Sequence, residues 1–278
     1  MNFEARFSKK SVRSGQILAV LIIGILLMLL LGSCSPKNKE TALDWDKSPE
    51  VRIIRVSDPI NFPGLSCTWQ DERMDNHIPE GQVFGDGRFI WVEYYRAEEV
   101  VARRVMEGRL SEAELSSLLG QISVSGFFSW KDHYSRVTFQ EDVPPNTIMY
   151  VNLKEKEKHV IVSSGAPAGF HELVRLVTTG AGTVGREYIP ERGYLEVHPF
   201  YYYDQDQDWQ LPLWPGEEAG FHLEELVYER GQFIEGPILE FVWQVINDSP
   251  GQPVVLDQDE AYTLVILIPG LSNIAIPD

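Results

Sequence analysis

The sequence predicts an α+β fold, in which an antiparallel sheet has helices packed on one face. Three observations favour it. Gly85-Asp86-Gly87 separates two apolar runs as in a β-hairpin, Ser111 and Glu114 match a helix-capping box, and strands and helices are segregated without βαβ alternation. The 278 residues are 44% hydrophobic and 23% charged, which is ordinary for a globular chain and excludes a disordered or multi-pass membrane protein.

The elements before the first helix are predicted to be strands. Residues 51–56, Val-Arg-Ile-Ile-Arg-Val, are the first strand candidate. The glycine-containing turn at 85–87 joins Val83-Phe84 to the run 89–92, and residues 100–106 continue as a further strand.

Two helices and two strands follow. Ser111 is the expected N-cap of a helix with Glu114 at the third position, and this helix should end between Gly120 and Gly126. Residues 147–153 and 159–162 read as strands joined by a charged turn. Pro167 is expected in the first turn of a second helix that Gly180 ends. The apolar face of the first helix comprises Leu115, Leu118, Leu119 and Ile122.

The composition changes after Gly185, which suggests one α+β domain at 51–185 and a smaller C-terminal α+β unit at 186–278. The C-terminal unit is expected to contain four elements: a strand at 193–198, a short helix at 221–227, a longer helix at 237–247 that starts with proline, and an apolar strand at 261–269.

The N-terminus carries the sharpest signal. Residues 1–16 are basic, residues 17–31 are apolar, and Leu31-Gly32-Ser33-Cys34 follows directly. This segment resembles the lipobox of bacterial lipoproteins, and the resemblance implies that Cys34 receives a diacylglyceryl group and that the chain is cut just before it. We expect residues 1–33 to be a signal peptide and 34–50 to be a tether. An uncleaved membrane anchor is the alternative, although 15 apolar residues are short for a span.

The body also shows a resemblance. The matching residues are the turn at 85–87, Leu110-Ser111 with Leu115 and Leu118, the run 126–134, the run 144–153 and Gly165-Ala166-Pro167. Together, about residues 80–178 resemble an uncharacterised domain of secreted bacterial lipoproteins. This resemblance implies a fold and a location outside the cytoplasm, and it implies no activity.

The charge balance bears on partners. The chain has 24 Lys and Arg against 41 Asp and Glu, a net charge of −17, which argues against a nucleic-acid binder. An acidic body is repelled by anionic lipid, so acyl chains would have to hold it at the cell membrane. The expected partners are the membrane, through the lipid anchor, and a protein, peptide or glycan of the cell envelope.

Two short patterns are similar to known cofactor or metal motifs, but each lacks a feature that the motif requires. Residues 180–185 have the spacing G-x-G-x-x-G, but a helix rather than a strand precedes them, so they read as a linker. His171 and Arg175 take the places of the two histidines of a zinc helix, and arginine cannot ligate a cation. We therefore predict no cofactor, no metal and no catalytic residue.

The expected ligand-facing part is the aromatic and acidic segment from Phe200 to Trp214, read as a surface loop. A lipid-anchored binding or interaction module is the leading hypothesis. The alternative is a cell-envelope hydrolase that pairs carboxylates from 204–208 with those from 257–260. A loose Ca²⁺ site or a solvated acidic loop would also explain the acids, and rings folded back over the sheet would also explain the aromatic residues. The ligand-facing candidates are Tyr202, Asp204, Asp206, Asp208, Trp209 and Trp214.

Overall fold

The computed structural model describes residues 43–57, 78–97, 100–135, 147–200, 210–227, 231–249, 253–273 and 276. The expected signal peptide, Cys34 and the first part of the expected tether lie outside these residues. Residues 43–278 form one compact unit. None of the helices described is both long and apolar enough to cross a membrane.

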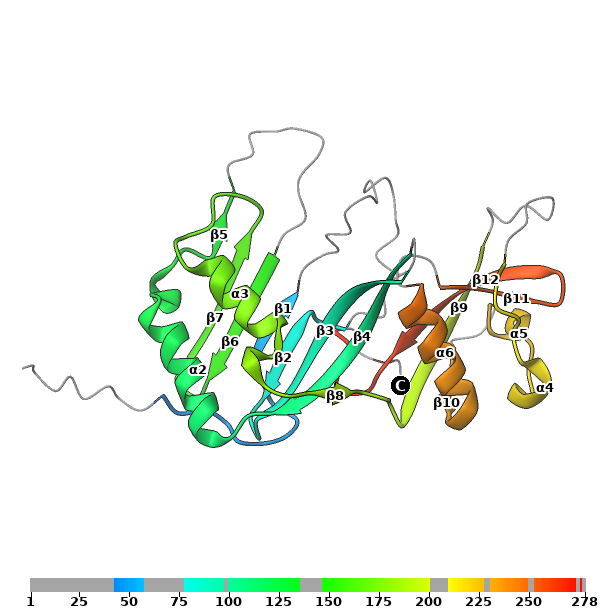
Figure 1. Ribbon diagram of the computed structural model, residues 1–278, viewed down its shortest axis with the longest axis horizontal. Helices are drawn as coiled ribbons and strands as arrows, with labels where there is room; N and C mark the ends of the chain where they lie inside the picture. Colours follow the sequence, from blue (N-terminus) through cyan, green and yellow to red (C-terminus); the bar gives the residue numbers. More distant parts are fainter. Residues whose placement is uncertain are drawn as a thin grey trace, which may run out of the picture. The chain divides into compact units, whose positions relative to one another are not determined.

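The first sheet has eight strands in the order β5-β7-β6-β1-β2-β3-β4-β8 (Figure 1). All its pairings are antiparallel except the one between β5 and β7. The antiparallel sheet of the α+β prediction is therefore confirmed. The strands are β1 (Arg52–Ser57), β2 (Gly81–Phe84), β3 (Arg88–Ala97), β4 (Val100–Arg109), β5 (His133–Tyr134), β6 (Thr147–Leu153), β7 (Lys156–Val162) and β8 (Arg186–Glu187).

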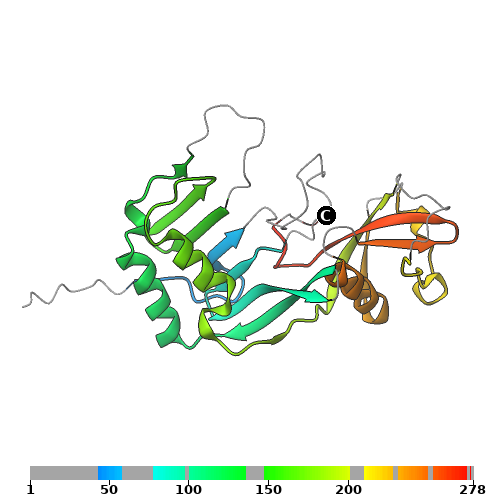
Figure 2. The ribbon, with the colours of Figure 1, turned by 45° about the horizontal axis from the view of Figure 1, so that its top comes forward.

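Helices α2 (Glu112–Val124) and α3 (Phe170–Thr178) pack on one face of this sheet, as Figures 1 and 2 show. The capping box of α2 is present: the Glu114 amide donates to Ser111 Oγ at 3.3 Å, and the Ser111 amide donates to Glu114 Oε2 at 2.7 Å. The predicted apolar face is buried. Pro167 is not in the first turn of α3, because Gly169 at φ 86° is the N-cap and the helix begins at Phe170. Short 3-10 helices follow α2 at Phe127–Ser129 and α3 at Gly180–Gly182.

The β2–β3 hairpin serves two cores, because successive side chains of a strand point to opposite faces. Phe89 and Trp91 lie in the cluster with α2 and α3. Ile90 and Val92 lie in a second cluster, which the C-terminal elements complete. The tight turn between the strands uses Gly87 in the left-handed region at φ 86°.

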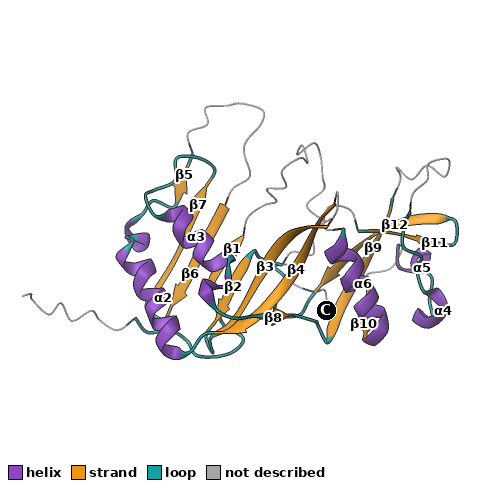
Figure 3. Cartoon of the chain, in the orientation of Figure 1, coloured by secondary structure: helices purple, strands orange, loops and turns teal. Residues whose placement is uncertain are grey.

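The second sheet has four antiparallel strands in the order β10-β9-β12-β11. Its β10 and β11 were not predicted, since each has only four residues and lacks a clear alternation. In Figure 3, α2 and α3 lie beside the first sheet and α6 lies beside the second. The C-terminal elements are β9 (Arg192–Pro199), α4 (Gly216–Ala219), α5 (Leu223–Val227), β10 (Gln232–Glu235), α6 (Gly236–Asp248), β11 (Val254–Asp257) and β12 (Glu260–Leu267).

Two features modify the predicted organisation. The tether prediction is wrong for residues 43–50, because Trp45 is buried and its Nε1 donates to the Gly85 carbonyl at 3.0 Å. Beyond the predicted boundary at residue 185, β8 still belongs to the first sheet. Buried side chains of both sheets, among them Val105 and Leu264, lie in the same hydrophobic cluster, so the C-terminal unit is packed on the first.

Candidate functional site

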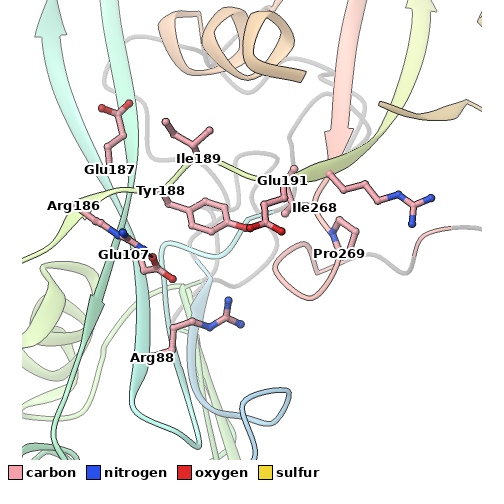
Figure 4. A pocket seen from close by; sticks show the side chains of 10 residues that line it. Arg88, Glu107, Arg186, Glu187, Tyr188, Ile189, Glu191, Ile268 and Pro269 are labelled. Carbon is pink, nitrogen blue, oxygen red and sulfur yellow. Dashed lines mark hydrogen bonds and ion pairs between the residues drawn. The ribbon is translucent and has the colours of Figure 1, made fainter. Parts of the chain in front are cut away.

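A pocket of about 660 Å³ lies where the chain passes from the first sheet to the second. Its wall comes from β3, β4 and β8 of the first sheet, from the connection between β8 and β9, and from the residues after β12 (Figure 4). This volume is in the range of small-molecule sites, which often form at such junctions. The lining residues are Arg88, Glu107, Arg186, Glu187, Tyr188, Ile189, Glu191, Arg192, Ile268 and Pro269.

The floor of the pocket continues a buried sheet face. Phe84, Ile90 and Val105 belong to the core that the second sheet covers. By strand alternation, Arg88 on β3 and Glu107 on β4 share that face with Ile90 and Val105, respectively. The pocket forms beyond this apolar patch, and the side chains that line it there are charged.

Tyr188 in the lining is held by both β4 and α6. Its amide donates to the Val105 carbonyl at 2.8 Å, and its own carbonyl accepts from Trp243 Nε1 at 3.2 Å. The ring stacks edge-on against Trp243, with centroids 6.2 Å apart. In Figure 4 the Tyr188 ring extends across the pocket toward Glu191. These contacts place a rigid aromatic ring and a hydroxyl in the pocket.

Charges surround the Tyr188 hydroxyl. Burial raises the pKa of Tyr188, with a smaller raising contribution from the carboxylates of Glu107 and Glu191, and the Arg88 charge opposes this shift. At neutral pH the phenol is therefore protonated and can donate a hydrogen bond to a ligand.

The three arginines of the pocket differ in their partners. Arg186 binds Glu107 through Nη2 at 2.9 Å. Arg192 pairs with Glu235 at 3.3 Å. Arg88 lies over the Phe84 ring, 4.0 Å from its centroid, and has no ion pair with a described residue; its buried Nε also has no hydrogen-bond acceptor there. Arg88 is thus the cationic group that this pocket offers to a ligand.

A second hollow of about 450 Å³ shares Ile268 and Pro269 with the first. Its arginine, Arg52, donates to the carbonyls of Gly270 at 3.0 Å and Ser272 at 2.9 Å. The Arg52 guanidinium therefore holds the loop after β12 onto β1, which makes this hollow a weaker candidate than the pocket around Tyr188.

The predicted ligand-facing segment falls largely outside the described residues, which exclude 201–209 and with them Tyr202, Asp204, Asp206, Asp208 and Trp209. Trp214 is described, and its prediction as ligand-facing is wrong: the side chain is 6% exposed, packs against Phe221 and Phe241, and donates from Nε1 to the Phe221 carbonyl at 3.1 Å. Phe200 is buried as well. These two aromatic rings are parts of the core.

The second acidic cluster contains a structural carboxylate. Asp257 is 6% exposed and accepts from the Leu223 amide at 2.7 Å through Oδ2. Its Oδ1 lies 3.1 Å from His222 Nδ1. Asp257 therefore binds the backbone at the start of α5, whereas Asp259 and Glu260 are exposed. The carboxylate pairing of the hydrolase hypothesis stays untested, since its other half lies at 204–208.

The glycine motif at 180–185 has a packing role. A Cβ on Gly180 would lie 2.9 Å from the Trp91 ring, and one on Gly185 would lie 2.2 Å from it. Gly180 and Gly185 thus make room for an indole rather than for a phosphate. His171 and Arg175 are both exposed, and Arg175 pairs with Glu172 on the same helix at 2.6 Å.

Sequence reasoning missed the pocket because the lining residues at 186–192 form no known motif and the other four, Arg88, Glu107, Ile268 and Pro269, are distant from them in the chain. A weak signal was present: between β8 and β9, exposed Ile189 adjoins Tyr188 within a run of charges, Arg186, Glu187, Glu191 and Arg192. Comparison of the chain with protein-family models, curated proteins and solved structures finds no match.

Proposed function

We propose that this protein is a binding module of the cell envelope, anchored by lipid on Cys34 and facing outside the cytoplasm. The pocket around Tyr188 is its ligand site in this proposal. The observation that carries it is Arg88, a cation that lines a pocket of ligand size without an ion pair to a described residue.

The make-up of the pocket supports binding. Binding sites place a few polar groups among apolar ones to fix a ligand's orientation. Here Ile189, Ile268 and Pro269 supply apolar surface, and Arg88 and the Tyr188 hydroxyl supply polar contacts. The net charge of −17 repels anions in general, so Arg88, which has no ion pair with a described residue, marks the part of this pocket where an anionic group of a ligand can bind.

The anchor is tested on the full chain expressed in a bacterium. Intact-mass analysis should show loss of residues 1–33 and a gain of acyl mass, and Cys34→Ala should abolish both. The sequence has one other cysteine, Cys67, and Cys67→Ala is the matched control, which should be processed normally. A Cys34→Ala protein that is still processed and held in the membrane fraction would refute lipidation.

The ligand site is tested with the detergent-solubilised lipoprotein and a digest of envelope peptides and glycans. Molecules retained by the protein are identified by mass spectrometry. We expect a compound that wild type and Arg104→Gln retain and that Arg88→Gln loses. Arg104 is the control because it is exposed on β4 and stacks on Tyr95. Equal retention by all three proteins would show that the pocket is not the site.

A further inference from the structure

Three charged side chains of the pocket lack an ion pair with any described residue: Arg88 on β3, Glu187 on β8 and Glu191 before β9. The other lining charges are paired, Arg186 with Glu107 and Arg192 with Glu235. The pocket therefore presents one cation together with carboxylates.

From this arrangement we propose that the pocket binds a zwitterionic ligand, a peptide end that carries both a carboxylate and an ammonium group. The carboxylate lies at Arg88 and the ammonium lies at Glu191. This inference rests on the proposed function and specifies the ligand class of the same site.

The chemistry of the Arg88 guanidinium explains why the carboxylate of the ligand binds there. Arginine donates two parallel hydrogen bonds to a carboxylate, and such charge-assisted bonds are roughly twice as strong as neutral ones. The Arg88 side chain enters the pocket from the sheet floor in Figure 4. The Tyr188 phenol lines the same pocket and is a second hydrogen-bond donor for the ligand.

The carboxylates of the pocket favour a zwitterionic ligand over a purely anionic one. Glu107 and Glu191 line the same pocket as Arg88, and in Figure 4 the Tyr188 ring extends toward Glu191. A ligand with negative charge alone, such as inorganic phosphate, would be repelled by the Glu191 carboxylate, which has no ion pair with a described residue. A ligand ammonium beside Glu191 removes that repulsion and adds an attraction.

The remaining wall suits a short side chain. Ile189 is 61% exposed, and Ile268 and Pro269 also line the pocket. A peptide end can place an apolar side chain on this surface while its two charges are bound. A pocket of this volume holds a small molecule or a chain end rather than the flat face of a protein.

The experiment measures binding of defined probes to the full chain in detergent by ligand-observed NMR, up to millimolar concentrations. The probes are Ala-Ala and Leu-Ala, their N-acetyl and C-terminal amide forms, and inorganic phosphate. Each blocked form should bind about 10- to 100-fold more weakly than the zwitterion, the loss expected for one hydrogen bond to a charged group. This series needs no variant and so does not depend on folding of a mutant.

Two variants then assign the ends. Arg88→Gln should remove the preference for the carboxylate over the amide, and Glu191→Gln should remove the preference for the amine over the N-acetyl form. Arg104→Gln and Glu240→Gln, at exposed positions, should keep both preferences. Each pocket variant should leave the other preference unchanged, which a general loss of folding would not do.

Three outcomes overturn the inference: no binding of any zwitterionic dipeptide, equal binding of blocked and unblocked forms, or tighter binding of phosphate. The proposed function fails separately, when Arg88→Gln retains every envelope compound that wild type retains. A compound that depends on Arg88 but lacks an amine would leave the binding module standing and refute the zwitterion.

Discussion

Gly185→Ala should destabilise the protein, because the new methyl group would overlap a buried indole. Its Cβ would lie 2.2 Å from Trp91 Cη2, 2.6 Å from Cζ2 and 3.2 Å from the Glu107 carbonyl oxygen. Trp91 is 2% exposed and cannot swing into solvent. Overpacking of this kind costs about 1–3 kcal/mol. The lower chain entropy of the unfolded alanine variant offsets about 0.4–1 kcal/mol, and the midpoints of the two ranges leave a net loss of about 1.3 kcal/mol.

Thermal and urea unfolding monitored by circular dichroism measure this loss. For a domain of this size the expected decrease in melting temperature is about 2–8 °C. Gly120→Ala is the matched control, since a Cβ there meets nothing within 4 Å and alanine in a helix stabilises by about 0.5–1 kcal/mol.

The contact with the indole is tested by a double-mutant cycle. In a Trp91→Phe background, the smaller ring should reduce the cost of Gly185→Ala. An unchanged cost in that background, or a neutral Gly185→Ala variant, would refute the packing explanation for the glycine motif.

Three further predictions concern stability. Leu118→Ala should cost about 2–5 kcal/mol in urea unfolding because Leu118 is 3% exposed under the sheet, and a loss below about half a kcal/mol would contradict its burial. Asp257→Ala should cost about 1–3 kcal/mol by leaving the buried Leu223 amide without its acceptor, whereas Glu240→Ala, at an exposed position of α6, should be neutral in the same assay. Burial and the hydrogen bond to Glu260 raise the pKa of Tyr262, so the unfolded state loses this proton first and the unfolding free energy should fall above pH ~10. Tyr262→Phe should flatten that fall, and an unchanged pH profile would exclude Tyr262 as its source.

Much of the first sheet and its helices could be predicted, because local signals and tertiary packing agree there. The capping box at Ser111 and the hairpin at 85–87 are both formed by residues adjacent in sequence. The four-residue β10 and β11 could not be predicted, since such short segments exist as strands only through pairing with β9 and β12. Local pattern therefore accounts for the long elements, and long-range pairing accounts for the short ones.

The aromatic side chains show where sequence reasoning about sites fails. Trp214 was expected at a ligand because it lies near prolines and acids, yet Phe221 and Phe241 enclose it. Trp45 was expected in a tether, yet it caps the hairpin at Gly85. In both cases a large apolar area is buried against residues distant in sequence, and that gain outweighs the polar character of the neighbouring chain.

The position of the candidate site follows from the same packing. The second sheet and α6 pack over Ile90 and Val105 of the first sheet. The segment between β8 and β9 connects the two sheets. At this crossing Tyr188 is held by Trp243 of α6 and by β4, so the ring that enters the pocket belongs to the structural joint between the sheets. A ligand bound at Arg88 and Tyr188 would therefore contact the segment that connects the two sheets. The free energy of binding would add to the stability of the two-sheet unit, so a ligand should raise the melting temperature of wild type and leave that of Arg88→Gln unchanged.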